Sequence, residues 1–174
     1  MSATAHCYLL IHFGEGDIDE FLADWRREAG SSAQVPLTFQ DLLPAPANLG
    51  AEDLRRWRHS NWDATGDVTD LSVISSDKSA VLVQFEATND GSQPAIAALS
   101  RRFPQLGLIH FVTFGILDQY GSAQIFSGGR EMIRLSGREP RTLGEAMLIG
   151  SETPSVVFET ILDHYSPAPV NRIR

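Results

Sequence analysis

The chain contains a single cysteine, a single lysine and no long apolar run. Because Cys7 has no second cysteine with which to form an intramolecular disulfide, this usage is typical of a reducing compartment. No segment approaches the ~18 consecutive apolar residues of a membrane-spanning helix. Residues 1–6 also lack the basic stretch and apolar run of a secretory signal. We therefore expect a cytoplasmic protein without membrane contacts.

Positive charge is also scarce. The formal net charge is -8, and Lys78 is the only lysine. Nucleic-acid binding takes most of its non-specific affinity from clustered basic side chains, so this balance argues against a nucleic-acid partner. Residues 55–59 interleave arginine with tryptophan, a pattern that can stack on bases. Single-stranded nucleic-acid binding on a sheet face stays a third alternative, which requires exposed aromatic side chains there.

The hydrophobic pattern predicts the element order β-α-β-β-α-β. Asp17 caps the first helix and Gly30 ends it, while Pro94 lies in the first turn of the second helix. The expected elements are a strand at 7–13, a helix between Asp17 and Gly30, strands at 70–74 and 80–87, a helix at 92–103 and a strand at 108–117. This order predicts a ferredoxin-like α+β sandwich, an antiparallel sheet with helices on one face.

Two additions to this unit are expected. Residues 33–66 form a long insertion with a short helix at 51–57, and its apolar side chains predict that it packs over the sheet. After residue 117, a Gly-Gly turn predicts a hairpin that extends the sheet. The hairpin strands are expected at 123–126 and 131–135, and helical segments at 142–149 and 154–165. We expect one domain at 1–165, followed by a flexible tail at 166–174.

A polar and aromatic stretch before the central strands carries a family resemblance. Residues 39–46 read F-x-x-L-L-P-x-P, residues 61–63 read N-W-D, and Leu99-Ser100 precedes an F-P-x-L ending at 103–106. These motifs resemble those of the YubB-type ferredoxin-like proteins of plasmids, phages and bacterial genomes. The resemblance implies a ferredoxin-like architecture and a mobile-element origin, and it implies no reaction.

The histidines provide no metal motif. None of the five has a second histidine at the spacing that places two ligands on one helix face. His12 and His110 could approach each other if their strands are neighbours in the sheet, but a zinc site would need a third ligand. The sequence also lacks a nucleophile elbow, and Cys7 lies within an apolar strand. We predict no catalytic residue, no metal and no cofactor.

The best candidate binding surface is the segment at residues 57–63. Tryptophan and arginine are enriched where the binding energy of protein interfaces concentrates. The candidate residues are Trp57, Arg58, His59, Asn61, Trp62 and Asp63. The alternative is a structural role, in which Trp62 completes the core while Asn61 and Asp63 shape a turn.

Two function hypotheses follow. The first is a non-enzymatic accessory or binding protein that contacts another protein, with a homodimer as one form of that contact. The second is a small-ligand-binding protein or enzyme with a pocket between the sheet and residues 33–66. That pocket would use His12, His59 or His110, and two of these histidines should line it.

Overall fold

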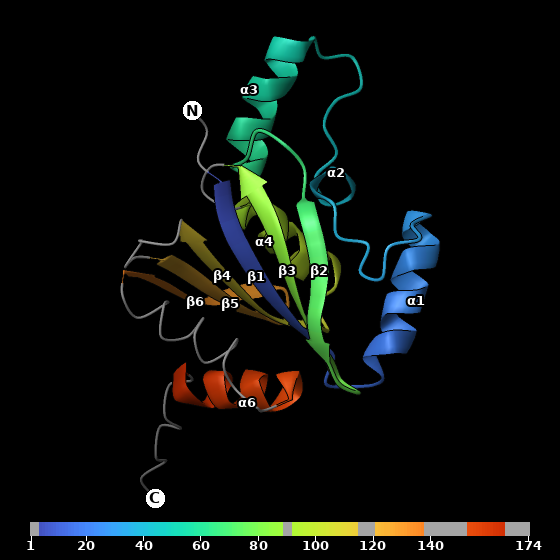
Figure 1. The fold of residues 1–174 in the computed structure, drawn as a ribbon, viewed down its shortest axis with the longest axis vertical. Coiled ribbons are helices and arrows are strands. Elements are labelled where there is room, and N and C mark those ends of the chain that lie inside the picture. The colour runs from blue at the N-terminus through green and yellow to red at the C-terminus, as the bar shows by residue number, and fades with distance from the viewer. Residues whose placement is uncertain (1–3, 89–91, 115–120, 138–152, 166–174) are drawn as a thin grey trace, which may run out of the picture.

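A computed structural model describes residues 4–88, 92–114, 121–137 and 153–165 of the 174-residue chain (Figure 1). Its strands are β1 (Thr4–His12), β2 (Thr69–Ser76), β3 (Ala80–Thr88), β4 (Gly107–Phe114), β5 (Gly121–Ser127) and β6 (Arg130–Gly137). Its helices are α1 (Ile18–Ala29), α2 (Phe39–Leu42), α3 (Ala51–Trp62), α4 (Gln93–Arg102) and α6 (Pro154–Tyr165). The predicted helix at 142–149, the strand residues 115–117 and the tail at 166–174 lie outside the described residues.

The six strands form one antiparallel sheet in the order β2-β3-β1-β4-β5-β6. The predicted hairpin is confirmed, since β5 pairs with β4 and β6 pairs with β5. Its turn contains Gly128 and Gly129 with φ angles of 59° and 75°, a conformation that glycine adopts without steric cost. The protein therefore has a mixed α+β fold whose sheet runs beyond β4.

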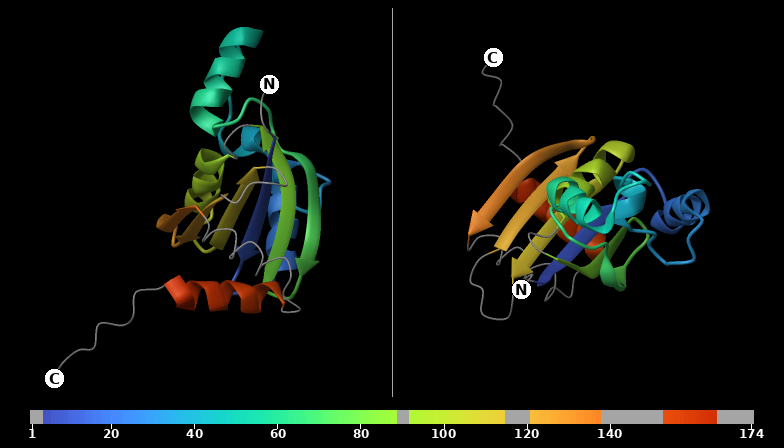
Figure 2. Two further views of the ribbon diagram at one scale, coloured as in Figure 1. Left: turned by 60° about the vertical axis from the view of Figure 1, so that its left-hand side comes forward. Right: turned by 90° about the horizontal axis from the view of Figure 1, so that it is seen from above.

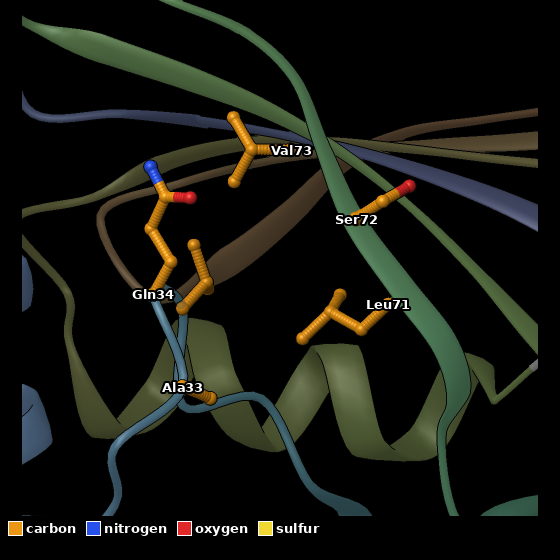
Figure 3. A pocket seen from close by; sticks show the side chains of 6 residues that line it. Ala33, Gln34, Leu71, Ser72 and Val73 are labelled. Atoms are coloured by element: carbon orange, nitrogen blue, oxygen red, sulfur yellow. The ribbon is translucent and has the colours of Figure 1, made fainter.

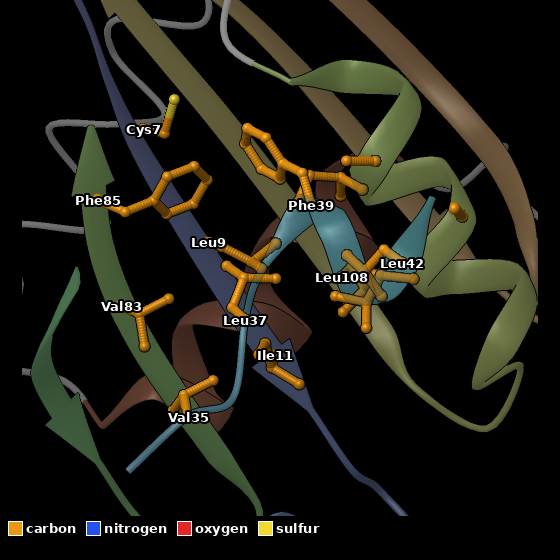
Figure 4. Close-up of a cluster of buried hydrophobic side chains, with 14 of the residues drawn as sticks. Cys7, Leu9, Ile11, Val35, Leu37, Phe39, Leu42, Val83, Phe85 and Leu108 are labelled. Atoms are coloured by element: carbon orange, nitrogen blue, oxygen red, sulfur yellow. The ribbon is translucent and has the colours of Figure 1, made fainter. Parts of the chain in front are cut away.

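The larger core lies on the sheet face that carries the odd-numbered side chains of β1. Leu9 and Ile11 of β1 and Phe85 of β3 are fully buried there (Figure 4). Side chains of α1, α2 and α4 cover them, including Trp25, Phe39 and Leu99, in agreement with the predicted helical layer. Burial of these large apolar side chains is the main stabilising contribution to the fold.

The C-terminal helix covers part of the opposite face. Its Val157, Phe158 and Ile161 pack against even-numbered side chains of β1 and β3, such as Leu10 and Leu82. In Figure 2 the helix runs across the strands below their ends. The sequence analysis predicts helices on one face of the sheet. In the structure, α6 adds a second, smaller core on the other face.

The 33–66 segment packs over the sheet as predicted. The ring of Phe39 in α2 lies 6.3 Å from that of Phe85 in an edge-to-face contact. α3 begins at Ala51 as expected but continues to Trp62, beyond the predicted end at residue 57. Its last residue is fully buried, and packing of that side chain explains why the helix persists through a polar sequence.

Candidate functional site

α3 projects beyond the end of the sheet and carries most of the predicted binding surface (Figure 1). Gly50 precedes its first residue, and Glu52 and Asp53 in the first turn complement the helix dipole. Asp63 ends the helix in the left-handed conformation, with φ 60°. Trp62 is the only buried residue among the twelve of this helix. The other side chains are exposed or half-buried.

Trp62 attaches the helix to the core. It is 0% exposed, and its Nε1 donates a hydrogen bond of 2.8 Å to the carbonyl oxygen of Leu43. Its ring makes edge-to-face contacts with Phe39 at 5.8 Å and with Trp57 at 5.9 Å. Trp62 therefore has a structural role in the core, and its ring is not accessible to a partner.

The two residues at 57 and 58 lie at the base of the projecting helix. Trp57 is half-buried against Trp62, and the guanidinium carbon of Arg58 lies 4.9 Å from the centroid of the Trp62 ring. This cation–π contact holds the Arg58 guanidinium against the Trp62 ring. Both residues keep part of their surface open to solvent.

The remaining candidates differ in their environment. His59 and Asn61 are exposed, and Asn61 Nδ2 donates a 2.8 Å hydrogen bond to the carbonyl oxygen of Trp57. Asn61 and Asp63 thus help to end the helix, as the structural alternative predicts. Arg56 was not among the predicted binding residues, although it is exposed on the same helix and its guanidinium lies 2.6 Å from the carboxylate of Asp53. The i, i+3 spacing of these two residues in the sequence could have indicated this ion pair.

His12 and His110, which could have approached each other on neighbouring strands, do not do so. Their strands are neighbours, but His12 lies opposite Gly107, while His110 lies opposite Leu9. Because side chains alternate along a strand, the two imidazoles point to opposite faces of the sheet. His12 stacks on Phe158 of α6 at 4.4 Å and lies 3.6 Å from Glu159.

His110 belongs to a row of polar side chains across β4, β5 and β6. His110 lies opposite Gln124, which lies opposite Arg134. Gln124 donates a 2.5 Å hydrogen bond to Glu131, and Arg134 donates two hydrogen bonds of 2.8 Å to the same carboxylate. Arg134 also donates to the Gln93 side chain at 3.1 Å. The row joins the buried sheet face to the first turn of α4.

His110 is the buried end of this row. It is 1% exposed, and neither ring nitrogen has a hydrogen-bond partner among the described residues. Burial lowers the pKa of His110 to about 4, and the neighbouring Gln124 amide partly opposes this shift. His110 is therefore a neutral imidazole at neutral pH, stacked parallel to Phe85 with ring centroids 6.3 Å apart.

A pocket of about 270 Å³ lies where the second hypothesis places it, between the sheet and the 33–66 segment (Figure 3). Its walls are residues 33–35 on one side and residues 71–73 of β2 on the other. The lining residues are Ala33, Gln34, Val35, Leu71, Ser72 and Val73. The hypothesis requires that two histidines line the pocket, and no histidine lines this one.

Within the ranges that the structure describes, no group of three or more histidine, cysteine, aspartate or glutamate side chains could hold a metal ion. No helix in those same ranges is long and apolar enough to cross a membrane.

Comparison with known proteins identifies no relative. No family model, curated protein or solved structure matches the sequence.

Proposed function

We propose that this chain is a non-enzymatic binding protein of the cytoplasm that contacts another protein through α3. The observation that carries the proposal is the projection of this helix, which buries only Trp62 (Figure 1). A helix that is polar on nearly every side gains little stability from packing on its own domain. Trp62 anchors only the C-terminal end of α3, and a partner would supply contacts to the turns that project beyond the sheet.

The side chains of α3 suit such a contact. Trp57 and Arg58 are half-exposed, and Arg56 and His59 on either side of them in the sequence are exposed. Arginine and tryptophan contribute most where a partner excludes water from them. The buried Trp62 and its hydrogen bond to Leu43 hold the helix in one orientation, which lowers the entropy lost on binding.

We infer that the first four strands and the α1 and α4 crossovers form a ferredoxin-like unit. The order β2-β3-β1-β4 within the six-stranded sheet supports this inference, as does the antiparallel pairing of each neighbour. On this view β5, β6, α3 and α6 are additions to a common scaffold. The YubB-type resemblance and the mobile-element origin that it implies belong to the same proposal.

A pair of matched substitutions tests the role of α3. Arg56 is 70% exposed and pairs with Asp53 three residues earlier, and Arg27 of α1 is 78% exposed and pairs with Asp24 at the same spacing. Arg56→Glu and Arg27→Glu therefore make the same change of charge in the same helical setting. Each variant and the wild type would be used as bait in quantitative affinity capture from the native host.

We expect that wild type and Arg27→Glu capture the same protein in equal amounts. Arg56→Glu should capture at least ten times less of that protein. Equal capture by all three baits, with all three folded, would contradict a contact through α3. Loss of the captured protein with both variants would place the contact elsewhere or make it a nonspecific effect of charge.

A further inference from the structure

The pocket beside β2 is bounded by two chain segments, residues 33–35 and residues 71–73. On one side, the guanidinium of Arg26 donates a 3.3 Å hydrogen bond to the carbonyl oxygen of Gln34. Val35 is 1% exposed, and its carbonyl oxygen accepts a 2.9 Å hydrogen bond from the amide of Leu37. These contacts hold the 33–35 wall against α1 and the core, so the pocket is formed without a ligand.

The other wall is an irregular part of the edge strand. The pairing of β2 with β3 shifts register between Thr69 and Ser72 and again between Val73 and Ser75. Asp70 lies within the first shift and has a positive φ of 51°. β-Bulges bend a strand and redirect its side chains, and they are frequent beside binding sites. Leu71 and Val73 point toward the 33–35 wall, and Ser72 points away from it (Figure 3).

The chemistry of the lining defines the ligand. Alanine, valine and leucine side chains supply apolar walls, and the Gln34 amide is the polar side chain that lies over the pocket (Figure 3). None of the six lining residues carries a charge, so a charged ligand would lose hydration without gaining a partner. The amide group of Gln34 can accept or donate one directional hydrogen bond.

The volume sets the size of the ligand. An apolar cavity of ~150 Å³ holds benzene, and drug-sized ligands occupy pockets of roughly 300 Å³ or more. About 270 Å³ therefore suits a bicyclic molecule of about ten non-hydrogen atoms. We propose that this pocket binds a small uncharged aromatic molecule whose polar group pairs with the Gln34 amide. This site is separate from α3 and does not depend on the proposed function.

The test uses indole as the probe, added to the full chain labelled with nitrogen-15. We expect saturable chemical-shift changes that concentrate at residues 33–35 and 71–73. Binding of 1-methylindole, which lacks the N–H donor, should be several times weaker. Gln34→Leu should remove the difference between the two probes, since Gln34 is exposed and its replacement leaves the core intact.

A second pair of variants separates filling of the pocket from a general effect on β2. Val73→Phe places a larger side chain in the pocket and should weaken indole binding at least tenfold. Ile74→Phe makes a comparable change at a neighbour that is 41% exposed and does not line the pocket, so binding should be unchanged.

Several results would overturn the proposal. They are the absence of saturable shifts with either probe, shifts spread over the whole molecule, and equal indole affinity of the folded Val73→Phe and Ile74→Phe variants. Saturable binding of N-acetyl-leucine amide without binding of indole would also overturn it, because the pocket would then accept the side chain of a partner protein.

Discussion

The ring of Phe158 lies directly over Gly107, so that a Cβ atom at residue 107 would be within 3.0 Å of three ring atoms. The same ring stacks on His12, with a centroid distance of 4.4 Å and an interplanar angle of 14°. Gly107 begins β4, and Phe158 lies on the inner side of α6. The absence of a side chain at residue 107 thus allows α6 to approach the second face of the sheet.

Gly107→Ala should therefore destabilise the protein by about 1–3 kcal/mol, the usual cost of overpacking a filled site. Urea denaturation monitored by circular dichroism would measure the change in the free energy of unfolding. Gly66→Ala is the control, because the nearest atom to its Cβ would be at 4.0 Å and its φ is not in the left-handed region. Adding Phe158→Leu to Gly107→Ala should recover part of the loss. Equal effects of Gly107→Ala and Gly66→Ala would contradict the contact.

Trp62→Ala should cost about 3–5 kcal/mol, since it removes a fully buried aromatic side chain and its hydrogen bond to Leu43. Trp57→Ala is the matched comparison, because the same side chain is removed from a half-buried position on the same helix. Its effect on the free energy of unfolding should be less than half as large. A cooperative, wild-type-like melting transition of Trp62→Ala would show that α3 is not attached to the core through this residue.

Local patterns were sufficient to predict many elements, because their causes lie within a few residues. Asp17 was predicted to cap α1, and its carboxylate accepts the amide hydrogen of Asp19 at 2.9 Å. Gly30 was predicted to end the helix, and it adopts the left-handed conformation with φ 61°. Pro154 was predicted near the start of the last helix, and α6 begins there.

The features that sequence could not supply depend on register and on distant packing. A shift of one residue in the pairing of β1 with β4 would place His12 and His110 on the same face of the sheet, and no local pattern sets that register. The full length of α3 depends on the contact of Trp62 with Leu43 and Phe39. The pocket depends on two register shifts in β2 and on the path of residues 33–35.

Asp77 connects the β2–β3 turn to the start of α6. One carboxylate oxygen accepts hydrogen bonds from the amides of Ser79 and Ala80 at 2.8 and 2.9 Å, and the other accepts one from Ser155 at 2.7 Å. Burial acts to raise the pKa of Asp77, but these hydrogen bonds outweigh it and hold the pKa below its usual value.

Asp77→Asn should destabilise the protein by about 1–3 kcal/mol at pH 7, because an amide nitrogen replaces one of the two accepting oxygens. A group whose pKa is lowered by folding stabilises the protein above its unfolded pKa, and this contribution disappears as the pH falls through the folded pKa. The difference between wild type and variant should therefore shrink below pH 4. Asp70→Asn, at an exposed position of β2, is the control and should have little effect on the unfolding midpoint.

His110 gives a different pH dependence. Its pKa is lowered from 6.5 to about 4 by burial, so the unfolded chain binds a proton that the folded protein does not bind between these values. The stability of the folded state should thus be unaffected by His110 above pH 6.5 and should fall as the pH decreases toward 4. At about 1.4 kcal/mol per pKa unit, the loss is about 3 kcal/mol.

His110→Phe removes this titration and can keep the parallel stacking on Phe85. The variant should lose about 3 kcal/mol less than the wild type between pH 7 and pH 4, measured by urea denaturation at several pH values. Asp77 and Glu131 titrate in both proteins, so their effects cancel in the difference. His59→Gln, a change at an exposed histidine, should reproduce the wild-type profile. Parallel profiles for wild type and His110→Phe would mean that the imidazole is not buried as a neutral group, because only a pKa difference between the folded and unfolded states produces such a slope.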